Sequence, residues 1–252
     1  MKDPKKTMLF PPPHFSLIGH RGAAGLAPEN TAASFKMAKN LGINWVEFDT
    51  QCCKTGEWVI FHDDTLERTT GKKGRLHDTA LKDLEKLEVG SFFAPQFKGE
   101  RILLLKEALH LLISLELHAN IEIKGDYTED PDLLRGFISI LSQDWPKTLP
   151  PPLVSSFHLE TVKFLKSNGL EVPYGYIIEE FKPDALEVVK KEDFFSLHCD
   201  YISLSAEDLK WLKKQQVPVL LYTVNDYETK VRLLNEGISA IFTDYPNLLI
   251  KD

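Results

Sequence analysis

The chain alternates between short apolar runs and longer stretches in which apolar residues recur every three or four positions. The short runs are rich in β-branched and aromatic residues, which is typical of strands, and the longer stretches have the period of an amphipathic helix. The runs interpreted as strands are FSLIGH, WVEFDT, WVIFH, ANIEIK, PLVSSF, YGYII, YISLS, PVLLYTV and AIFTD. Helices are expected over residues 31–41, 105–115, 131–142, 159–167, 183–191, 206–215 and 227–236.

This order of elements predicts an α/β fold with parallel strands. A strand followed by a helix of this length returns through a right-handed crossover, and eight such units close into a (β/α)8 barrel, the TIM barrel. Nine candidates fill eight places, so WVIFH is expected to be extra, because the turn KTGE folds it back beside WVEFDT. The rival is a doubly wound open sheet, but no glycine-rich phosphate-binding motif follows the first strand. We therefore expect residues 1–252 to form a single TIM-barrel domain.

The alternation lapses at about 64–104, after the second strand. This stretch is polar, contains glycines and is only weakly helical in its middle. About 40 residues without a strand–helix unit inside a compact domain indicate an insertion that covers a functional face. Its aromatic residues Phe92, Phe93 and Phe97 are expected to form a small core that packs the insertion onto the barrel, with an apolar wall for a substrate as the alternative.

Composition and charge narrow the possible ligands and the compartment. The 252 residues are 43% hydrophobic and 27% charged, as in ordinary globular proteins. A net charge of -7 leaves no broad basic surface for nucleic acid, so an anionic ligand must be held by a few local cations or a metal. We expect no signal peptide, because the apolar patch before the first prolines is only three residues long, and no apolar run comes near the roughly 18 residues of a membrane span. Three cysteines cannot pair completely, so we expect a reducing, cytoplasmic location.

Acidic side chains occur in two of the expected strands, near the rim where a parallel barrel gathers its catalytic groups. Glu47 and Asp49 are two residues apart, so their side chains point to the same side, and Glu122 lies near the end of another strand. Three carboxylates this close are costly unless they share a cation, and hard oxygen ligands suit Mg²⁺ or Ca²⁺ better than zinc. The three residues are therefore candidate ligands of one divalent cation.

Two histidines stand at strand ends beside these acids. His20 follows the first strand and His62 ends the extra one. An imidazole can accept or donate a proton near neutral pH, so the two are candidates for paired acid and base catalysis. Arg21 and Lys124 are expected to face an anion, because a guanidinium matches the geometry of phosphate oxygens. A structural role is expected for His14, His77, His110, His118, His158 and His198.

Six short motifs follow one another between Ile18 and Pro246. In order they are GHRGAAGLAPENT, VEFDTQ, VIFHDDTLERTT, NIEIK, YTVN and AIFTDYP. Together they resemble the glycerophosphodiester phosphodiesterases. The resemblance implies a (β/α)8 barrel with an insertion after the second strand. It also implies hydrolysis of small glycerophosphodiesters to an alcohol and sn-glycerol 3-phosphate, with a divalent cation, Mg²⁺ or Ca²⁺.

The resemblance also assigns roles to matching positions. It implies that His20 and His62 are the general acid and base. It implies that Glu47, Asp49 and Glu122 bind the metal. It also implies that Arg21 and Lys124 contact the phosphate. Asn30 lies in the Pro-Glu-Asn-Thr segment, within expected reach of the substrate or the metal, and Glu29 is expected to fix that loop. Tyr222 stands where the family more often has tryptophan, so it is expected to shape the rim that contacts the substrate.

Two other functions stay open at this point. A lysophospholipase D-like hydrolase of lipid phosphodiesters would use the apolar residues of the insertion. A non-catalytic barrel that binds phosphodiesters would be expected to have lost a histidine or a metal carboxylate, whereas this chain retains every one. The expected partner is a small molecule, without stable membrane insertion. The sequence leaves open which alcohol is released, whether the ion is Mg²⁺ or Ca²⁺, and which histidine acts first as the base. It also leaves open whether the reaction passes through a cyclic phosphate or proceeds by direct attack of water, and what the oligomeric state is.

Overall fold

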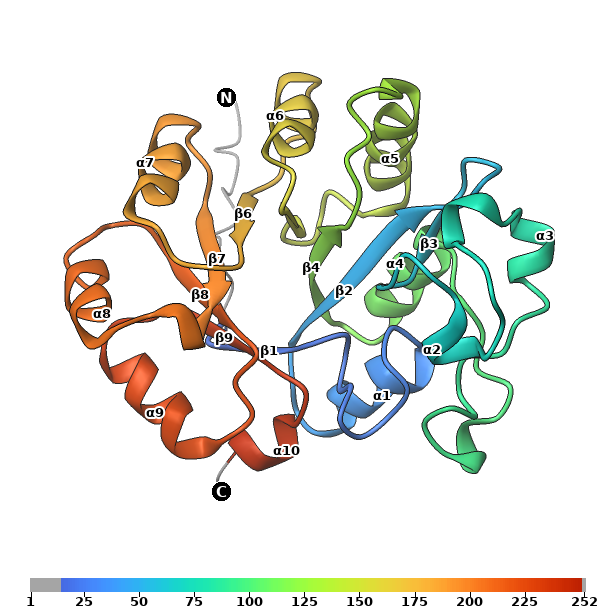
Figure 1. Cartoon of the computed structure of the whole chain (residues 1–252), viewed down its shortest axis with the longest axis horizontal. Coiled ribbons are helices and arrows are strands. Elements are labelled where there is room, and N and C mark those ends of the chain that lie inside the picture. Colours follow the sequence, from blue (N-terminus) through green and yellow to red (C-terminus); the bar gives the residue numbers. More distant parts are fainter. Residues whose placement is uncertain (1–14, 251–252) are drawn as a thin grey trace, which may run out of the picture.

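The strands close into a barrel that is ringed by helices in the computed structural model, which describes residues 15–250 (Figure 1). The parallel strands of the ring are β1 (Leu17–Gly19), β2 (Trp45–Cys52), β4 (His118–Ile123), β5 (Leu153–Ser156), β6 (Tyr174–Ile178), β7 (Ser196–Asp200), β8 (Val219–Tyr222) and β9 (Ala240–Thr243). Because β1 pairs with both β2 and β9, the sheet has no open edge within this ring. The predicted TIM barrel is confirmed, and the open sheet is excluded. The strand predicted at YISLS is wrong: the ring strand is SLHCD just before it, whose serine, histidine and aspartate hid the pattern, and Tyr201–Ser203 is a turn of 3-10 helix.

One further strand, β3 (Trp58–Ile60), lies outside the ring. It pairs antiparallel with the end of β2, where Thr50 is opposite Ile60, so the prediction that WVIFH is the extra strand is confirmed. The hairpin brings the chain back down to the rim, since the Phe61 N–H donates to the carbonyl of Asp49 over 3.1 Å. His62 therefore follows directly at the level of the acidic residues of β2.

Helices connect successive strands around the outside of the barrel (Figure 1). They are α1 (Ala32–Asn40), α4 (Leu105–Ser114), α5 (Pro131–Asp144), α6 (Leu159–Ser167), α7 (Pro183–Lys191), α8 (Ala206–Leu212) and α9 (Tyr227–Asn235), and α10 (Pro246–Leu249) follows β9. Local sequence fixes several starts: the side chain of Thr31 accepts from the Ser34 N–H, and proline opens α5 and α7. The seven predicted helices are confirmed within a few residues, and α10 was not predicted.

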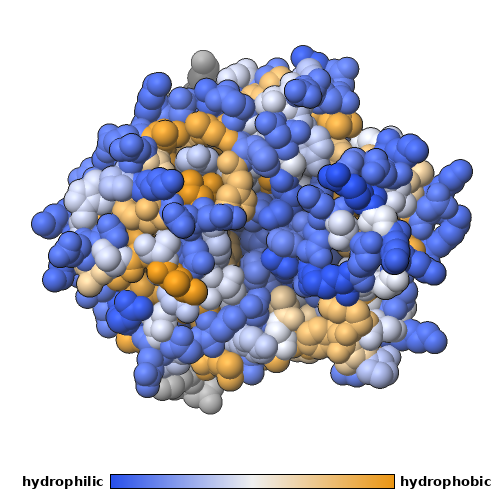
Figure 2. Space-filling view, viewed as in Figure 1, coloured by the Kyte–Doolittle hydropathy of each residue, from blue (hydrophilic) through white to orange (hydrophobic). Residues whose placement is uncertain are grey.

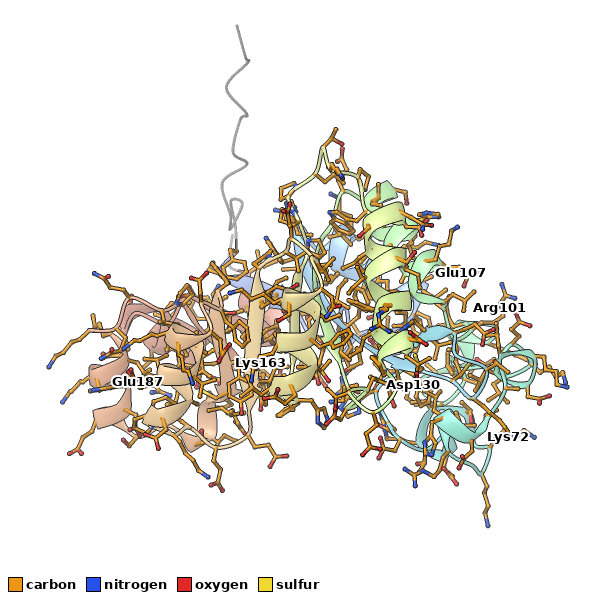
Figure 3. All side chains as sticks on the ribbon, turned by 90° about the horizontal axis from the view of Figure 1, so that it is seen from above. Lys72, Arg101, Glu107, Asp130, Lys163 and Glu187 are labelled. Atoms are coloured by element: carbon orange, nitrogen blue, oxygen red, sulfur yellow. The ribbon has the colours of Figure 1, made fainter. Side chains whose placement is uncertain are left out.

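The segment between β3 and α4 contains only single turns of helix. These are α2 (Glu67–Thr70), η1 (Leu76–Asp78), α3 (Leu81–Leu84) and η2 (Pro95–Phe97). Leu66, Leu76 and Leu84 form a separate apolar cluster with Val59 of β3. The segment stands out to one side of the barrel in Figure 3, with Lys72 at its outer edge. Phe93 contacts Phe92 and Phe97 at centroid distances of 6.4 and 5.5 Å, but none of the three is buried and Phe92 is 40% exposed. The prediction that they form the core of this segment is therefore wrong, because the leucine cluster takes that place.

Apolar side chains fill the barrel from its amino end. Ile18, Trp45 and Phe242 belong to a buried cluster inside the ring, while the larger core lies between the strands and the helices. Because this apolar cluster fills the amino end of the barrel, the polar side chains of the interior lie at the opposite end, where the strands have their carboxyl ends. None of the helices within residues 15–250 has both the length and the apolar character needed to cross a membrane.

Candidate active site

Three carboxylates meet where β2 and β4 lie side by side. Glu47 and Asp49 occupy alternate positions of β2, and Asp49 is directly opposite Glu122 of β4 in the parallel register. One ligand oxygen from each lies within 4.8 Å of the other two, and the Oε1 atom of Glu47 is buried without a hydrogen-bond partner. The cluster could bind a metal ion, because a cation would satisfy this oxygen and offset the charges.

The pKa values of the three carboxyl groups are shifted in different directions by their surroundings. Burial, followed by the charges of Asp49 and Glu122, raises the pKa of Glu47 well above its ordinary value. Burial and then Asp49 raise the pKa of Glu122 as well. Burial opposes ionisation of Asp49 too, but nearby positive charges, Arg21 first among them, outweigh it and lower the pKa of Asp49. A bound divalent cation would favour the ionised form of all three.

The imidazole of His20 is oriented by a carboxylate that follows β9. Its Nδ1 atom lies 2.7 Å from Oδ1 of Asp244, and its Nε2 atom lies 3.9 Å from Oε2 of Glu47. Asn225 donates to the second oxygen of Asp244 over 2.9 Å and accepts from the Asp244 backbone N–H over 2.9 Å. This chain of contacts directs Nε2 of His20 toward the acidic cluster.

The imidazole of His62 is oriented in the same way by the next residue. Its Nδ1 atom lies 2.7 Å from Oδ1 of Asp63, whose two oxygens also accept from Arg68 over 2.6 and 2.8 Å. Burial opposes ionisation of Asp63, but the hydrogen bonds from Arg68 and His62 outweigh it and lower the pKa to about 2. Burial lowers the pKa of His62 in spite of nearby Asp49. Burial thus favours the neutral form of the His62 imidazole.

Arg21 and Lys124 flank the acidic cluster. Arg21 donates through Nη1 to Glu29 over 2.8 Å, and its Nε atom lies 3.3 Å from Asp49. Lys124 donates to Glu122 over 2.7 Å and lies 3.8 Å from Asp49. Both side chains are held by acids on one side, which leaves their remaining N–H groups for an anion at the rim.

Two neighbouring hollows lie at this end of the barrel. The inner cavity has a volume of about 130 Å³, and it is lined by His20, Arg21, Glu47, His62, Asn120, Glu122, Lys124, Phe157, Ile177, His198, Tyr222, Thr223 and Phe242. The outer groove has a volume of about 920 Å³ and shares His62, Lys124, Phe157 and Tyr222 with the inner cavity. Figure 2 shows polar surface gathered around the hollowed centre of this face, with apolar surface on the side of α7 and α8.

Of the two further residues expected to contact the substrate, Tyr222 lines the inner cavity and Asn30 does not. Asn30 donates to Oδ2 of Asp49 over 2.8 Å and accepts from the Asp49 N–H over 3.2 Å, so its side chain holds Asp49 and does not line the inner cavity. Tyr222 lines both hollows, and its hydroxyl donates to the carbonyl of Ile178 over 2.7 Å. Glu29, expected to fix its loop, pairs with both Arg21 and Arg68.

Some histidines with an expected structural role border these hollows. His198 is buried inside the barrel and lines the inner cavity, where burial lowers its pKa to about 3 and Ser196 lies within 2.8 Å of its Nε2 atom. His158 lines the outer groove. His110 pairs with Asp144, His118 stacks on Trp45 and His77 is exposed beside Asp78. His14 lies outside the described residues.

Comparison with known protein families agrees with this geometry. The model of the glycerophosphoryl diester phosphodiesterase family matches residues 20–248, which include every residue of the cluster and both imidazoles. The chain belongs to this family. The resemblance of its six motifs is thereby confirmed, and membership makes the chain an enzyme of the phosphoric diester hydrolase class.

Individual family members are similar over almost their whole length. A glycerophosphodiester phosphodiesterase of Caldanaerobacter subterraneus is 31% identical, with 93% of this chain and 96% of that protein covered. One from Bacillus subtilis is 28% identical over 98% of this chain and 89% of its own. The structure of an Oleispira antarctica phosphodiesterase in complex with sn-glycerol-3-phosphate is 33% identical with a TM-score of 0.88, covering 93% of this chain and 94% of that one.

Several contacts of this family member were not predicted from its sequence. Arg68 bridges Glu29 and Asp63, and Asn225 holds Asp244. Asp63 and Asp244 stand inside two of the six motifs, directly after His62 and Thr243, so the motifs carried a signal for them. Arg68 and Asn225 also stand inside two of the motifs, VIFHDDTLERTT and YTVN, but the spacing of residues there gives no indication of where their side chains point.

Proposed function

We propose that the chain hydrolyses glycerophosphodiesters to an alcohol and sn-glycerol 3-phosphate in a metal-dependent reaction catalysed by His20 and His62. The observation that carries the proposal is the arrangement of two aspartate-held imidazoles around one acidic cluster in one small cavity. The Oleispira antarctica relative, which holds sn-glycerol-3-phosphate, supports the choice of product. We propose further that residues 1–252 act as a single domain with an insertion at about 64–104.

The ligands proposed for the metal are Glu47, Asp49 and Glu122. The unsatisfied buried oxygen of Glu47 and the 4.8 Å spacing of the donor atoms fit one hard divalent cation, Mg²⁺ or Ca²⁺. When bound, such an ion supplies Lewis-acid polarisation of phosphoryl oxygens and lowers the pKa of a hydroxyl nearby. Asn30 is proposed to position Asp49 for this task, since it bonds to both the side chain and the backbone of Asp49.

The two imidazoles are proposed to move the protons. One accepts the proton of the attacking 2-hydroxyl of glycerol as its oxygen bonds to phosphorus, and the other donates a proton to the alcohol oxygen as its bond to phosphorus breaks. Water then opens the resulting cyclic phosphate with the two roles reversed. Direct attack by water would use the same two residues. Asp244 and Asp63 hold the Nδ1 atoms, which leaves Nε2 of each ring for these transfers.

Arg21 and Lys124 are proposed to bind the phosphoryl group. Both line the inner cavity beside the acidic cluster, where they would offset the negative charge that builds on the phosphoryl oxygens. Tyr222 is proposed to form part of the wall against which the substrate lies, with the face of its ring, because its hydroxyl is engaged by the backbone.

A panel assay tests the proposal. The native chain, supplied with Mg²⁺ or Ca²⁺, is incubated with a set of glycerophosphodiesters, and sn-glycerol 3-phosphate is measured with the released alcohol. We expect both products in equal amounts. Release of a phosphorylated alcohol and free glycerol, or no release from any ester, would refute the proposal. Lysophosphatidylcholine is included as a lipid substrate, and exclusive hydrolysis of it would favour the lysophospholipase D-like alternative. That alternative relied on the apolar residues of the insertion, but Phe92, Phe93 and Phe97 line neither the inner cavity nor the outer groove.

A further inference from the structure

The inner cavity is too small for a whole phosphodiester. Its volume of about 130 Å³ compares with the roughly 300–1,000 Å³ of pockets that enclose a small-molecule ligand. One ester branch must therefore leave the inner cavity. The outer groove, at about 920 Å³, begins at the same four side chains that close the inner cavity, His62, Lys124, Phe157 and Tyr222. An ester branch that extends past these residues enters the groove.

The far part of the groove is lined by acids. Glu179 and Glu180 follow β6, and Asp200 ends β7. Within residues 15–250, none of the three forms an ion pair with a lysine, an arginine or a histidine. Lys124, the lysine of this lining, sits at the inner end and is neutralised by Glu122 at 2.7 Å. The groove thus presents uncompensated negative charge to whatever branch occupies it.

Aromatic rings line the same groove. Phe157 and Tyr222 meet edge to face with ring centroids 6.4 Å apart, and Phe181, the residue after Glu180, lines the groove as well. Lys124 lies 5.3 Å over the ring of Phe157, a cation–π contact at the inner end of this wall. Because the Tyr222 hydroxyl is bonded to the carbonyl of Ile178, its aromatic ring and not its hydroxyl is left for a ligand in the groove. Rings and carboxylates together suit an ammonium group, above all a methylated one.

Hydrogen bonds between two loops hold this wall in place. The Asp200 N–H donates to the carbonyl of Glu179 over 3.3 Å, and the Phe181 N–H donates to Oγ of Ser203 over 3.0 Å. The Ser203 hydroxyl donates in turn to the carbonyl of Asp200 over 2.7 Å. The acids and Phe181 are therefore carried on one hydrogen-bonded unit, so less conformational entropy is lost when a ligand binds.

We propose that the outer groove binds the alcohol branch of the substrate and selects alcohols that carry an ammonium group, through Glu179, Glu180 and Asp200 and the rings of Phe157, Phe181 and Tyr222. The inference rests on the function proposed above, because it needs a phosphodiester in the inner cavity. It adds a choice of leaving group that the acidic cluster and the imidazoles do not make.

The test compares three esters that differ in the charge of the alcohol. kcat/KM is measured for glycerophosphocholine, glycerophosphoethanolamine and the neutral glycerophosphoglycerol, on the native chain and on the double variant Glu179→Gln/Glu180→Gln. We expect the native chain to prefer both cationic esters and the double variant to lose about fivefold of this preference, through a rise in KM for the cationic esters that exceeds any change for the neutral one. The preference of the native chain is also expected to fall as salt is raised.

Glu187→Gln supplies the matched control. Glu187, labelled in Figure 3, is an exposed acid of α7 that does not line the groove, and its loss is expected to leave the preference for cationic esters unchanged. A native chain that hydrolyses the neutral ester as well as the cationic ones, or a double variant that keeps the native preference, overturns the groove assignment and leaves the proposed function standing. If none of the three esters is hydrolysed, the proposed function fails and the groove assignment fails with it.

Discussion

Each of the two imidazoles at the rim has one ring nitrogen engaged by an aspartate, and each aspartate is held by a further side chain. For His20 the partners are Asp244 and Asn225, and for His62 they are Asp63 and Arg68. A carboxylate on Nδ1 fixes the orientation of the ring and stabilises the imidazolium that forms when Nε2 accepts a proton. The same arrangement thus serves a base and an acid.

Replacing either histidine tests the paired roles. We expect His20→Ala and His62→Ala each to lower kcat by about 10²- to 10⁴-fold, because general acid or base catalysis is lost on one side of phosphorus. Release of sn-glycerol 3-phosphate measures the effect, and a thermal melt checks that the fold is retained. If both variants turn over at the native rate, the assignment of acid and base is wrong.

Arg68 is proposed as a positioning residue, because it holds Asp63 and Glu29 without lining the inner cavity. Arg68→Ala is expected to lower kcat about tenfold with little change in KM. Since Arg68 acts through Asp63, the double variant Arg68→Ala/Asp63→Asn should lose little more activity than Asp63→Asn alone. A kinetic double-mutant cycle measures this coupling, and strictly additive losses would speak against the role.

The buried imidazole of His198 makes stability depend on pH. Its pKa is about 3 in the folded chain against an ordinary 6.5, so the unfolded chain takes up a proton that the folded chain refuses. The free energy of unfolding is unaffected by titration of this group above about pH 6.5. It decreases as the pH falls from there toward 3, by up to about 1.4 kcal/mol per pH unit. Urea unfolding between pH 7 and 5 should show a shallower pH dependence for His198→Gln than for the native chain; equal slopes would contradict it.

Most residues that gather at the rim could be predicted one by one. His20 and Glu122 lie at or near strand ends, and parallel strands bring those ends to one rim whatever the loops do. Glu47 lies two residues before Asp49 in β2, so its side chain points to the same side as that of Asp49. Asn30 was expected to reach the substrate or the metal, and its contact with Asp49 depends on how the loop before α1 turns back. Loop direction of that kind follows from packing, which the local pattern does not encode.

At the scale of elements, the loop between β1 and α1 depends on one glycine. Gly22 has a φ of +90°, and a Cβ added there would stand 2.2 Å from Oγ of Ser34 in α1. The same Ser34 hydroxyl donates to the carbonyl of Arg21 over 2.6 Å, and the Arg21 N–H donates to Glu47 over 2.8 Å. The tight approach of loop to helix therefore sets the place of Arg21 above the acidic cluster.

Substitution of this glycine is expected to affect activity as well as stability. Gly22→Ala should destabilise the fold by about 2 kcal/mol through strain and should lower kcat by at least about tenfold, because Arg21 is displaced. Gly42→Ala is the matched control: Gly42 has a φ of +80° with nothing within 4 Å of an added Cβ, so we expect a smaller loss of stability and native turnover. Thermal melts and the product assay separate the two effects. Native activity in Gly22→Ala would remove the link from this loop to the site.

The long elements were predictable because their pattern repeats. Helices such as α6 and α7 span at least two turns, so the spacing of their apolar residues defines them. The four elements between β3 and α4 are single turns, which are too short to show a period. For the same reason α10, a single turn opened by Pro246, was missed.

For the whole molecule, closure of the ring depends on contacts between distant parts of the chain. The pattern of strands and helices predicted the number of units, but an open sheet has the same alternation, and only the pairing of β1 with β9 decides between them. The two hollows have the same origin, since residues from β1 through β9 line the inner cavity. Their volumes could not be predicted from the sequence.

Binding of a metal ion should stabilise the whole molecule. At about 100 times its Kd, an ion that binds only the folded chain adds about 2.7 kcal/mol, which for a chain of this size raises Tm by about 5 °C or more. We expect this rise on addition of Mg²⁺ or Ca²⁺ to chelator-treated protein, and a smaller one in Glu47→Gln. Calorimetry measures it independently of turnover. If neither ion moves Tm and a chelator leaves turnover intact, the acidic cluster is not a metal site.

The order of the chain divides the work at the rim between two halves of the barrel. The proposed metal ligands, both imidazoles, and the arginine and lysine proposed to bind the phosphate fall between His20 and Lys124. The acidic and aromatic residues of the outer groove fall between Phe157 and Tyr222. Recombining the first half with the second half of a relative, with Asp244 and Asn225 kept in place, would therefore exchange the preferred leaving group and conserve the reaction.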